Sequence, residues 1–275
     1  MAGLYYNFLI RQGDLRAMKK AGKVIFWIIT IVLKIILFIA GVNLVFSFIA
    51  QKKRGAVPED GRFYDWKFGK IFYRKCGRGM PVLLIHGLEP ANSSADLSAL
   101  TRYLSEKHTV YAIDLLGFGF SDKPWITYTN FLYVQLFRDF IRDVIGEKSD
   151  VVAYGGSALS TLQAYNFDPT GFGKIVLIEP CRQESIKAAK PFALKLKNVL
   201  DFPIFGTFLY NIYSLTGAAP FDRDSRHVFA SRLTGHLTTD LSKRPELLKP
   251  EMSVFGDPAE EKGLFTYGDI GKALM

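Results

Sequence analysis

The stretch VVAYGGSALS, residues 151–160, begins as a short apolar strand and breaks into two glycines before a serine. A buried strand that turns sharply into a helix at Gly-x-Ser presents a nucleophilic hydroxyl at the edge of a sheet. Ser157 is therefore the candidate nucleophile, and its neighbours Gly155, Gly156 and Ala158 are small enough to leave it room. The glycine expected two residues after the serine is absent, because Leu159 stands there.

The same stretch permits a second register. If Ala153 takes the place of the first glycine of the motif, Gly155 falls at the nucleophile position and the turn carries no hydroxyl. The length of the strand, counted from Asp150, favours the register with Ser157 at the turn. The residues alone leave both registers open.

Outward from this turn, apolar strands alternate with helical patterns. PVLLIHG and HTVYAIDLLG are continuous apolar runs, as in strands buried on both faces. Apolar residues recur at helical spacing in residues 94–107 and 130–148, and KIVLIEP is a further strand. This alternation predicts an α/β fold with a mostly parallel sheet and helices on both faces. A hairpin around Gly69 is expected to precede the sheet, and PEMSVFGD is expected to supply a late strand.

Three segments together resemble the α/β-hydrolase fold family over roughly residues 62–182. They are VLLIHGLEPANSS (82–94), VYAIDLLGFGFSDKP (110–124) and the Gly-x-Ser turn. In that family the His-Gly turn supplies one backbone N–H to an oxyanion hole, and the residue after the nucleophile supplies the other. The resemblance implies the amides of Leu88 and Ala158. Two such donors stabilise the negative charge that develops on a carbonyl oxygen during acyl transfer.

A serine nucleophile also needs a histidine to take its proton and a carboxylate to orient that histidine. The chain has four histidines, and we expect His86 to be structural because it belongs to the His-Gly turn. His236, or His227, is the candidate base, contributed by a helical segment above the sheet.

Two carboxylates are candidates for the acid. Asp257 follows the late strand, with Glu260 close behind it, and Glu179 follows the strand KIVLIE. A simpler interpretation of Glu179 is a strand-end carboxylate that binds nearby amides. The family places its histidine after a last strand, and this chain carries none beyond His236. We therefore expect an incomplete triad, through truncation of the chain or loss of activity.

The N-terminal region contains one apolar run, residues 24–50, interrupted by Lys34 and Asn43 and flanked by basic residues on both sides. About 20 apolar residues cross a bilayer, and the aliphatic side chains outweigh the cost of about 2.5–3.5 kcal/mol for a mid-span lysine. A buried amphipathic helix is disfavoured because no polar face emerges. A cleaved signal peptide would have an apolar region of only about 7–15 residues. The excess of basic residues before the run favours an extracytoplasmic C-terminal domain.

The composition limits the remaining function classes. The net charge of +9 is partly explained by the flanks of the apolar run, and no nucleic-acid-binding motif accompanies it. Cys76 and Cys181 form neither a disulfide framework nor metal-ligand spacing. The expected organisation is a basic N-terminal segment (1–23), a transmembrane anchor (24–50), a linker (51–61), the α/β-hydrolase core (62–181), a helical lid (182–250), and a late core strand with the C-terminal tail (251–275).

These features predict a membrane-anchored serine hydrolase that acts on a carboxylic ester or similar acyl bond. The aromatic lid would shape a pocket for a small apolar or acyl substrate, and the bilayer is the second partner. Neither a metal nor an organic cofactor is expected. The alternative is a catalytically incomplete, hydrolase-fold binding protein at the membrane. A haloalkane- or epoxide-type enzyme would need an aspartate at the turn, where none stands. The sequence gives no indication of oligomeric state.

Overall fold

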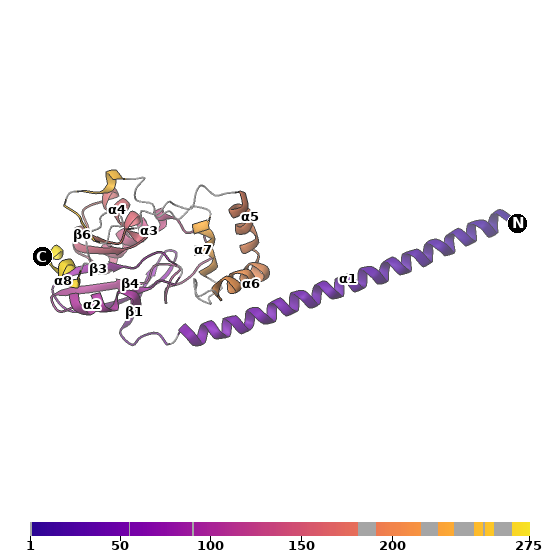
Figure 1. Cartoon of the computed structure of the whole chain (residues 1–275), viewed down its shortest axis with the longest axis horizontal. Coiled ribbons are helices and arrows are strands. Elements are labelled where there is room, and N and C mark those ends of the chain that lie inside the picture. The colour runs from indigo at the N-terminus through magenta and orange to yellow at the C-terminus, as the bar shows by residue number, and fades with distance from the viewer. Residues whose placement is uncertain are drawn as a thin grey trace.

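The computed structural model describes residues 2–54, 56–89, 91–180, 191–215, 225–233, 245–249, 251–255 and 266–275. Within these residues the chain forms one seven-stranded sheet in the order β1-β2-β4-β3-β5-β6-β7 (Figure 1). The strands are β1 (Gly61–Trp66), β2 (Gly69–Cys76), β3 (Met80–Ile85), β4 (His108–Ile113), β5 (Ser149–Tyr154), β6 (Phe172–Ile178) and β7 (Ser253–Phe255).

Most of the sheet is parallel, which confirms the fold class expected from the sequence. β1 and β2 form the predicted antiparallel hairpin, in which Trp66 pairs with Gly69, and β2 runs antiparallel to β4. All other neighbouring strands are parallel. The chain passes from β3 to β4 on one side and then returns to place β5 on the other side of β3. The switch point of the sheet therefore lies between β3 and β5.

Side chains alternate between the two faces of the sheet along each strand, so the apolar strands present apolar side chains on both faces. Helices cover both faces. Leu83 and Ile85 of β3 pack in one buried cluster with residues of α3 and α4, and Val82 and Leu84 pack in a second cluster with residues of α2 and α8. The helices are α1 (Ala2–Arg54), α2 (Ser98–Leu104), α3 (Asn130–Phe140), α4 (Ser157–Phe167), α5 (Pro191–Leu200), α6 (Pro203–Ser214), α7 (Arg226–Leu233) and α8 (Tyr267–Leu274). Short 3₁₀ helices cover Ser94–Leu97 and Pro245–Leu247, and a π-helical turn, Ile141–Ile145, continues α3.

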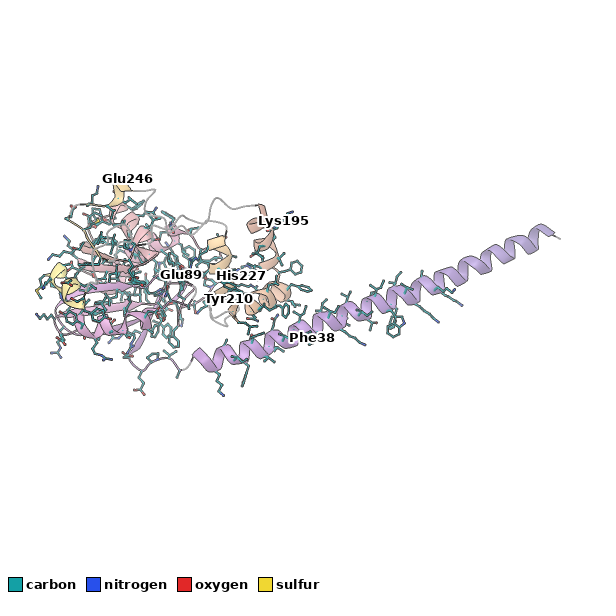
Figure 2. The ribbon with its side chains drawn as sticks, in the orientation of Figure 1. Phe38, Glu89, Lys195, Tyr210, His227 and Glu246 are labelled. Atoms are coloured by element: carbon teal, nitrogen blue, oxygen red, sulfur yellow. The ribbon has the colours of Figure 1, made fainter. Side chains whose placement is uncertain are left out.

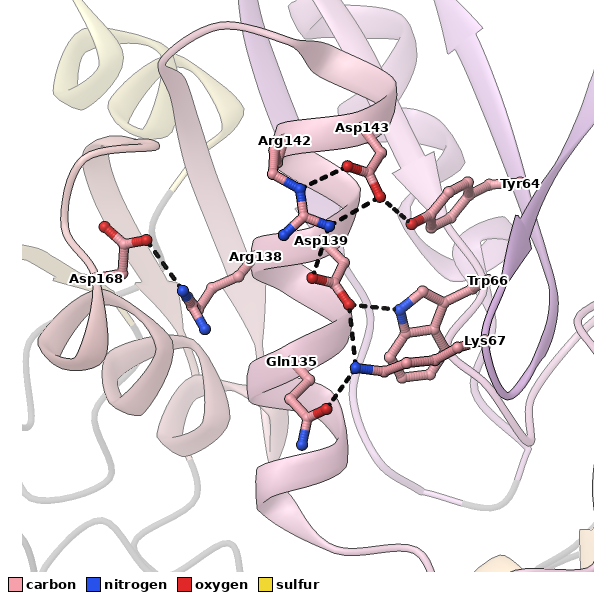
Figure 3. Close-up of polar contacts among 9 residues, drawn as sticks. All are labelled: Tyr64, Trp66, Lys67, Gln135, Arg138, Asp139, Arg142, Asp143 and Asp168. Carbon is pink, nitrogen blue, oxygen red and sulfur yellow. Dashed lines mark hydrogen bonds and ion pairs between the residues drawn. The ribbon is translucent and has the colours of Figure 1, made fainter.

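The hairpin is held against α3 and its π-helical extension by a polar network (Figure 3). Asp139 accepts a hydrogen bond of 2.8 Å from the indole nitrogen of Trp66 and lies 3.0 Å from Arg142. Asp143 accepts a bond of 2.6 Å from the hydroxyl of Tyr64 and also pairs with Arg142. Burial and the bond to Asp143 raise the pKa of Tyr64, so its phenol is neutral at physiological pH. The network holds β1, an edge strand of the sheet, against α3. Strands β2 and β4 separate this edge from the loops that follow β3 and β5.

Helix α1 extends away from the sheet domain as a long rod, with the N-terminus at its far end (Figure 1). Within Lys19–Ala50 the most apolar window of 18 residues has a mean hydropathy of 2.7 and is 6% buried, so this helix is long and apolar enough to cross a membrane. Its C-terminal part packs against helix α6. The side-chain amide of Asn43 makes two hydrogen bonds to α6. It donates one of 2.9 Å to the carbonyl oxygen of Ile204 and accepts one of 3.1 Å from the side-chain amide of Asn211.

Helix α8 was not expected from the sequence, which predicted only a strand and a tail in this region. Its first turn carries a capping box: Thr266 accepts from the amide of Asp269, and the Asp269 carboxylate accepts from the amide of Thr266. Ile270 and Leu274 then pack on the sheet beside α2. The helix completes the second face of the fold.

Candidate active site

The carboxyl ends of β3 and β5 meet at the switch point of the sheet, where open α/β folds bind their ligands. The turn after β3 holds His86, Gly87 and Leu88, and the turn after β5 holds Gly155 and Gly156. A Cβ on Gly155 would lie 3.8 Å from the Cα of Gly87. The two turns predicted to form the site are therefore adjacent.

Gly155 occupies the strained position of the strand-to-helix turn. It follows the last residue of β5 directly, and its φ of +58° is a conformation that residues with a side chain rarely adopt. Gly156 is the N-cap of α4, and the helix begins at Ser157. In a nucleophile elbow the strained turn residue carries the nucleophile. The backbone thus follows the second register, with Ala153 and Ser157 at the flanking small positions and Gly155 between them.

Ser157 lies two residues beyond this strained position, inside the first turn of α4. Its side chain is fully buried, and its hydroxyl donates a bond of 2.8 Å to the carbonyl oxygen of Tyr154. The Ala158 amide donates 3.2 Å to the carbonyl of Gly155. Both groups predicted for catalysis are thus used within the turn itself, and this geometry argues against the roles of nucleophile and oxyanion donor. In the second register the residue after the turn position is Gly156.

His86 is structural, as its place in the His-Gly turn suggested. Its Nδ1 lies 2.6 Å from the carbonyl oxygen of Gly87, and its Nε2 accepts 3.0 Å from the amide of Leu115. These partners require the neutral tautomer that carries its proton on Nδ1. Burial is the main cause that lowers the pKa of His86, outweighing the opposite effect of Asp114. Both ring nitrogens are occupied, so His86 holds the turn that presents Leu88.

The loop after β4 supports the site from the other side. Asp114 is buried, and its carboxylate accepts a hydrogen bond of 2.7 Å from the amide of Ser94 and one of 2.8 Å from the amide of Phe120. Gly119 passes so close that a Cβ there would lie 2.0 Å from the Asp114 carboxylate, at a φ of +44°. The family-like sequence DLLGFGFSDKP thus folds around one buried carboxylate, which explains its glycine at position 119.

Glu179 lies at the end of β6 and faces the same edge of the sheet. Its carboxylate accepts a bond of 2.5 Å from the hydroxyl of Tyr154, the last residue of β5. Glu179 also has a φ of +46°, the one positive value of a non-glycine residue in the described part of the chain. Left-handed strain in a residue with a side chain is concentrated at functional or tightly constrained positions. The carboxylate is bound to a phenol here rather than to a histidine.

Helix α7 closes over the turn that follows β3. Arg232 donates 2.7 Å to the carbonyl oxygen of Leu88 and binds both carboxylate oxygens of Glu89 at 2.7 Å. Figure 2 shows Glu89 at the side of the sheet domain that faces α7. His227, on the same helix, stacks on the ring of Trp125 and lies 3.9 Å from Asp201. The sequence did not single out Arg232, because an isolated arginine in a helix carries no local signal.

The remaining predicted site residues, His236 and Asp257, lie outside the described residues. Among the residues that the structure does describe, His108 stands at the opposite end of β4 from the site, and His86 and His227 have the partners given above. Within the same part of the chain, no three His, Cys, Asp or Glu side chains are grouped to hold a metal ion.

Comparison with known proteins agrees with this architecture. A family described as the alpha/beta hydrolase family matches residues 82–266, more than half of the chain. The chain belongs to the alpha/beta hydrolase family. An alpha/beta hydrolase fold protein from Burkholderia ambifaria aligns with a TM-score of 0.55 at 16% identity, covering 80% of this chain and 87% of that one. A hydrolase from Pseudomonas aeruginosa PA01 aligns at 0.51 and 17%, covering 70% and 78%.

Relatives found by sequence match over shorter segments. A 2-hydroxy-6-oxo-6-(2'-aminophenyl)hexa-2,4-dienoic acid hydrolase of Metapseudomonas resinovorans is 35% identical over 95 residues, which are 34% of this chain and 32% of that protein. An uncharacterized protein of Mycobacterium tuberculosis is 32% identical over 107 residues, or 38% and 30% of the two chains. The matched segment thus spans about a third of each relative, and the likeness to solved structures concerns the fold alone.

Proposed function

We propose that this member of the alpha/beta hydrolase family is held in a membrane by α1 and binds a small apolar or acyl ligand without hydrolysing it. The observation that carries the proposal is the φ of +58° at Gly155. The strained residue of the turn is the one that would carry a nucleophile, and here it has no side chain. A hydroxyl, thiol or carboxylate is therefore missing from the point where acyl chemistry would begin.

The family scaffold supports binding at this edge. The turn that presents Leu88 is held by His86, and it lies beside the Gly155 turn, as ligand recognition at a switch point requires. Helices α5–α7 would act as a lid, fastened by the contact of Arg232 with Glu89. Among the described residues outside its own turn, the one atom within 4 Å of a Cβ placed on Gly155 is the Cα of Gly87, at 3.8 Å, which leaves this part of the turn open for a ligand carbonyl.

Anchoring is supported by the exposure of α1. A core helix of a soluble domain would bury its apolar side chains, whereas the window of highest hydropathy in α1 is 6% buried. Phe26, Trp27, Phe38 and Phe48 each expose more than 60% of their surface. Removing that much apolar surface from water requires a lipid environment or a partner chain. The basic residues on both flanks fit lipid headgroups.

The rival proposal is the serine hydrolase expected from the first register, with Ser157 as nucleophile. It is favoured by the relatives that are named as hydrolases. It requires α4 to unwind at its first turn, so that the Ser157 hydroxyl leaves the carbonyl of Tyr154.

The experiment is activity-based labelling of the full-length protein in detergent with a fluorophosphonate probe. We expect no labelling above the level of Ser157→Ala. Labelling of the wild type that Ser157→Ala abolishes would overturn the proposal in favour of the hydrolase.

A second experiment tests the register of the turn directly, in a protein in which Cys76 and Cys181 are replaced by serine. A thiol introduced by Gly155→Cys should react with iodoacetamide much faster than one introduced by Ser157→Cys, and the reverse order would contradict it.

Binding is tested with dansyl-undecanoate, a fluorescent acyl probe. We expect its fluorescence to rise in the presence of the protein and to lose that rise in Gly155→Leu, which fills the space above the turn. Gly146→Leu is the matched control. Gly146 also has a positive φ, and no atom of the described residues beyond its chain neighbours lies within 4 Å of its Cβ position, but it stands at the end of the π-helical turn. An equal response of both variants would contradict binding at this edge.

A further inference from the structure

Helix α6 carries a stripe of exposed apolar side chains that no described part of the protein covers. No charged residue occurs between positions 202 and 215. The stripe, spaced by three or four residues, consists of side chains that are each 39–63% exposed: Phe202, Phe205, Leu209, Ile212 and Leu215. A contiguous apolar surface of this kind marks a site of interaction with a protein or a membrane.

The other sides of α6 are already occupied. Thr207, Tyr210 and Ser214 are buried on the side where Tyr210 packs with Leu200 of α5 and Ala230 of α7. A second side meets α1, through the bonds of Asn43 to the carbonyl of Ile204 and to Asn211. The exposed stripe is thus a third face, and it is not the face by which the helix is held in the fold.

The contact with Asn43 sets the depth of α6 along α1. The last basic residue before the apolar run is Lys23, so the run begins at Val24. About 20 helical residues cross the hydrocarbon core, at 1.5 Å per residue. Counted from Val24, that distance ends close to Asn43. Helix α6 therefore meets α1 where the chain leaves the hydrocarbon, at the boundary with the headgroups.

Helix α1 also exposes apolar side chains near Asn43, at the level where it meets α6. Leu44, Val45 and Phe48 are 60–72% exposed, although they lie within one or two turns of Asn43. Helix α1 therefore exposes apolar side chains at the same level as the stripe of α6. Figure 2 shows Phe38 on the part of α1 next to α6 and Tyr210 on α6, beside α7.

We propose that α6 is a second membrane contact, which lies in the boundary between headgroups and acyl chains with its stripe toward lipid. This inference rests on the proposed anchoring by α1 and extends it, because an anchor alone would leave the domain free to move in the water above the bilayer. The occupant of the stripe is a lipid bilayer, since α6 is fixed to the membrane-crossing helix at that depth.

The test uses full-length protein, with Cys76 and Cys181 replaced by serine, in phosphatidylcholine vesicles that contain doxyl-labelled lipid. A single cysteine carrying the fluorophore NBD is placed by Phe205→Cys or Leu209→Cys in the stripe. Phe38→Cys reports on the span. Phe167→Cys is the matched aqueous control, because Phe167 is 63% exposed at the end of α4, across the sheet domain from the candidate site.

We expect doxyl lipid to quench the fluorophore at positions 38, 205 and 209 at least about twofold more than at position 167. Quenching at 38 without quenching at 205 and 209 would overturn the inference while leaving the anchor in place. Quenching at none of the three would overturn the anchor as well. If 205 and 209 are shielded both from doxyl lipid and from aqueous iodide, a protein surface covers the stripe, and the lipid assignment is excluded.

Discussion

Arg232 of helix α7 binds Glu89 through two hydrogen bonds of 2.7 Å, one to each carboxylate oxygen. A paired geometry of this kind fixes direction as well as distance, because the guanidinium and carboxylate planes must align. The pair joins the helix above the site to the turn that carries Leu88. Since Glu89 is 63% exposed, its contribution to overall stability is expected to be small, and its main effect is on the position of α7.

Removing this pair should loosen α7 more than it destabilises the protein. For Glu89→Ala, which removes the pair but keeps the bond from Arg232 to the Leu88 carbonyl, we expect a loss of at most about 1 kcal/mol in unfolding free energy, together with faster amide exchange in residues 226–233. Asp60→Ala is the control, because its carboxylate is 50% exposed and pairs with Arg74 of the hairpin. Unchanged exchange in α7 would show that other contacts hold the helix in place.

Substitution of two glycines should separate backbone strain from collision. Gly155→Ala has room for its Cβ, so the left-handed φ alone should cost about 1–2 kcal/mol. Gly119→Ala adds a methyl group 2.0 Å from the Asp114 carboxylate and should cost about 3 kcal/mol or more. Thermal or denaturant unfolding in detergent measures both. A Gly155→Ala variant as unstable as Gly119→Ala would mean that the space above the turn is filled.

His86 should make the free energy of unfolding of the protein decrease as the pH falls into the mildly acidic range. Burial holds its pKa below the ordinary value of 6.5, so the unfolded chain binds the proton more readily than the folded one. The stabilisation is therefore complete above pH 6.5 and declines as the pH falls below it. His86→Gln should be less stable near pH 7.5, because the bonds to Gly87 and Leu115 change. Its stability should fall less than that of the wild type between about pH 7.5 and pH 5.5.

The polar network between hairpin and α3 predicts a large difference between two aspartates. Asp139→Ala leaves the buried indole N–H of Trp66 without its acceptor and should cost about 1–3 kcal/mol. Asp65→Ala removes only an exposed pair with Lys70 at 3.8 Å and should change stability by less than about 0.5 kcal/mol. Chemical denaturation of both variants decides the point, and equal losses would contradict the role given to Asp139.

Asn43 should control the attachment of α6 to α1. Asn43→Leu keeps the apolar character of the run but removes the bonds to Ile204 and Asn211, worth about 1 kcal/mol or less each in a membrane setting. We expect faster amide exchange in α6 and an unchanged sheet domain. Thr30→Val is the control, because the Thr30 hydroxyl bonds only within α1, to the carbonyl of Phe26. Equal exchange rates in the two variants would contradict this attachment.

The sequence was sufficient to predict the fold because its strands are continuous apolar runs. VLLI at 82–85 and VVA at 151–153 are buried on both faces of the sheet, and a parallel sheet covered by helices on both faces hides such runs. The hairpin at Gly69 followed from turn chemistry. Helix α8 was missed although its capping pair, Thr266 and Asp269, was visible in the sequence, because a single short helix has little periodicity to detect.

The register of the turn after β5 could not be decided in the same way. Both alignments place small residues around the turn, so composition does not separate them. The deciding quantity is the φ of Gly155, which depends on where the last hydrogen bond of β5 falls; the Gly155 amide still donates to the carbonyl of Ile178 on β6. That bond extends the strand to the first glycine and moves the turn two residues ahead of Ser157. Arg232 and Asn43 act through partners about 140 to 170 positions away in the sequence, which no local pattern reveals.

The hydrogen bonds of Asn43 have a consequence for how a ligand would arrive. With α1 inserted in a bilayer, these bonds restrain rotation of the sheet domain about its linker and keep helices α5–α7 on the side of the lipid. Compounds dissolved in the membrane would then reach the protein by lateral diffusion, at concentrations set by their partition coefficient. Selectivity would begin with solubility in lipid, before any residue at the switch point makes contact.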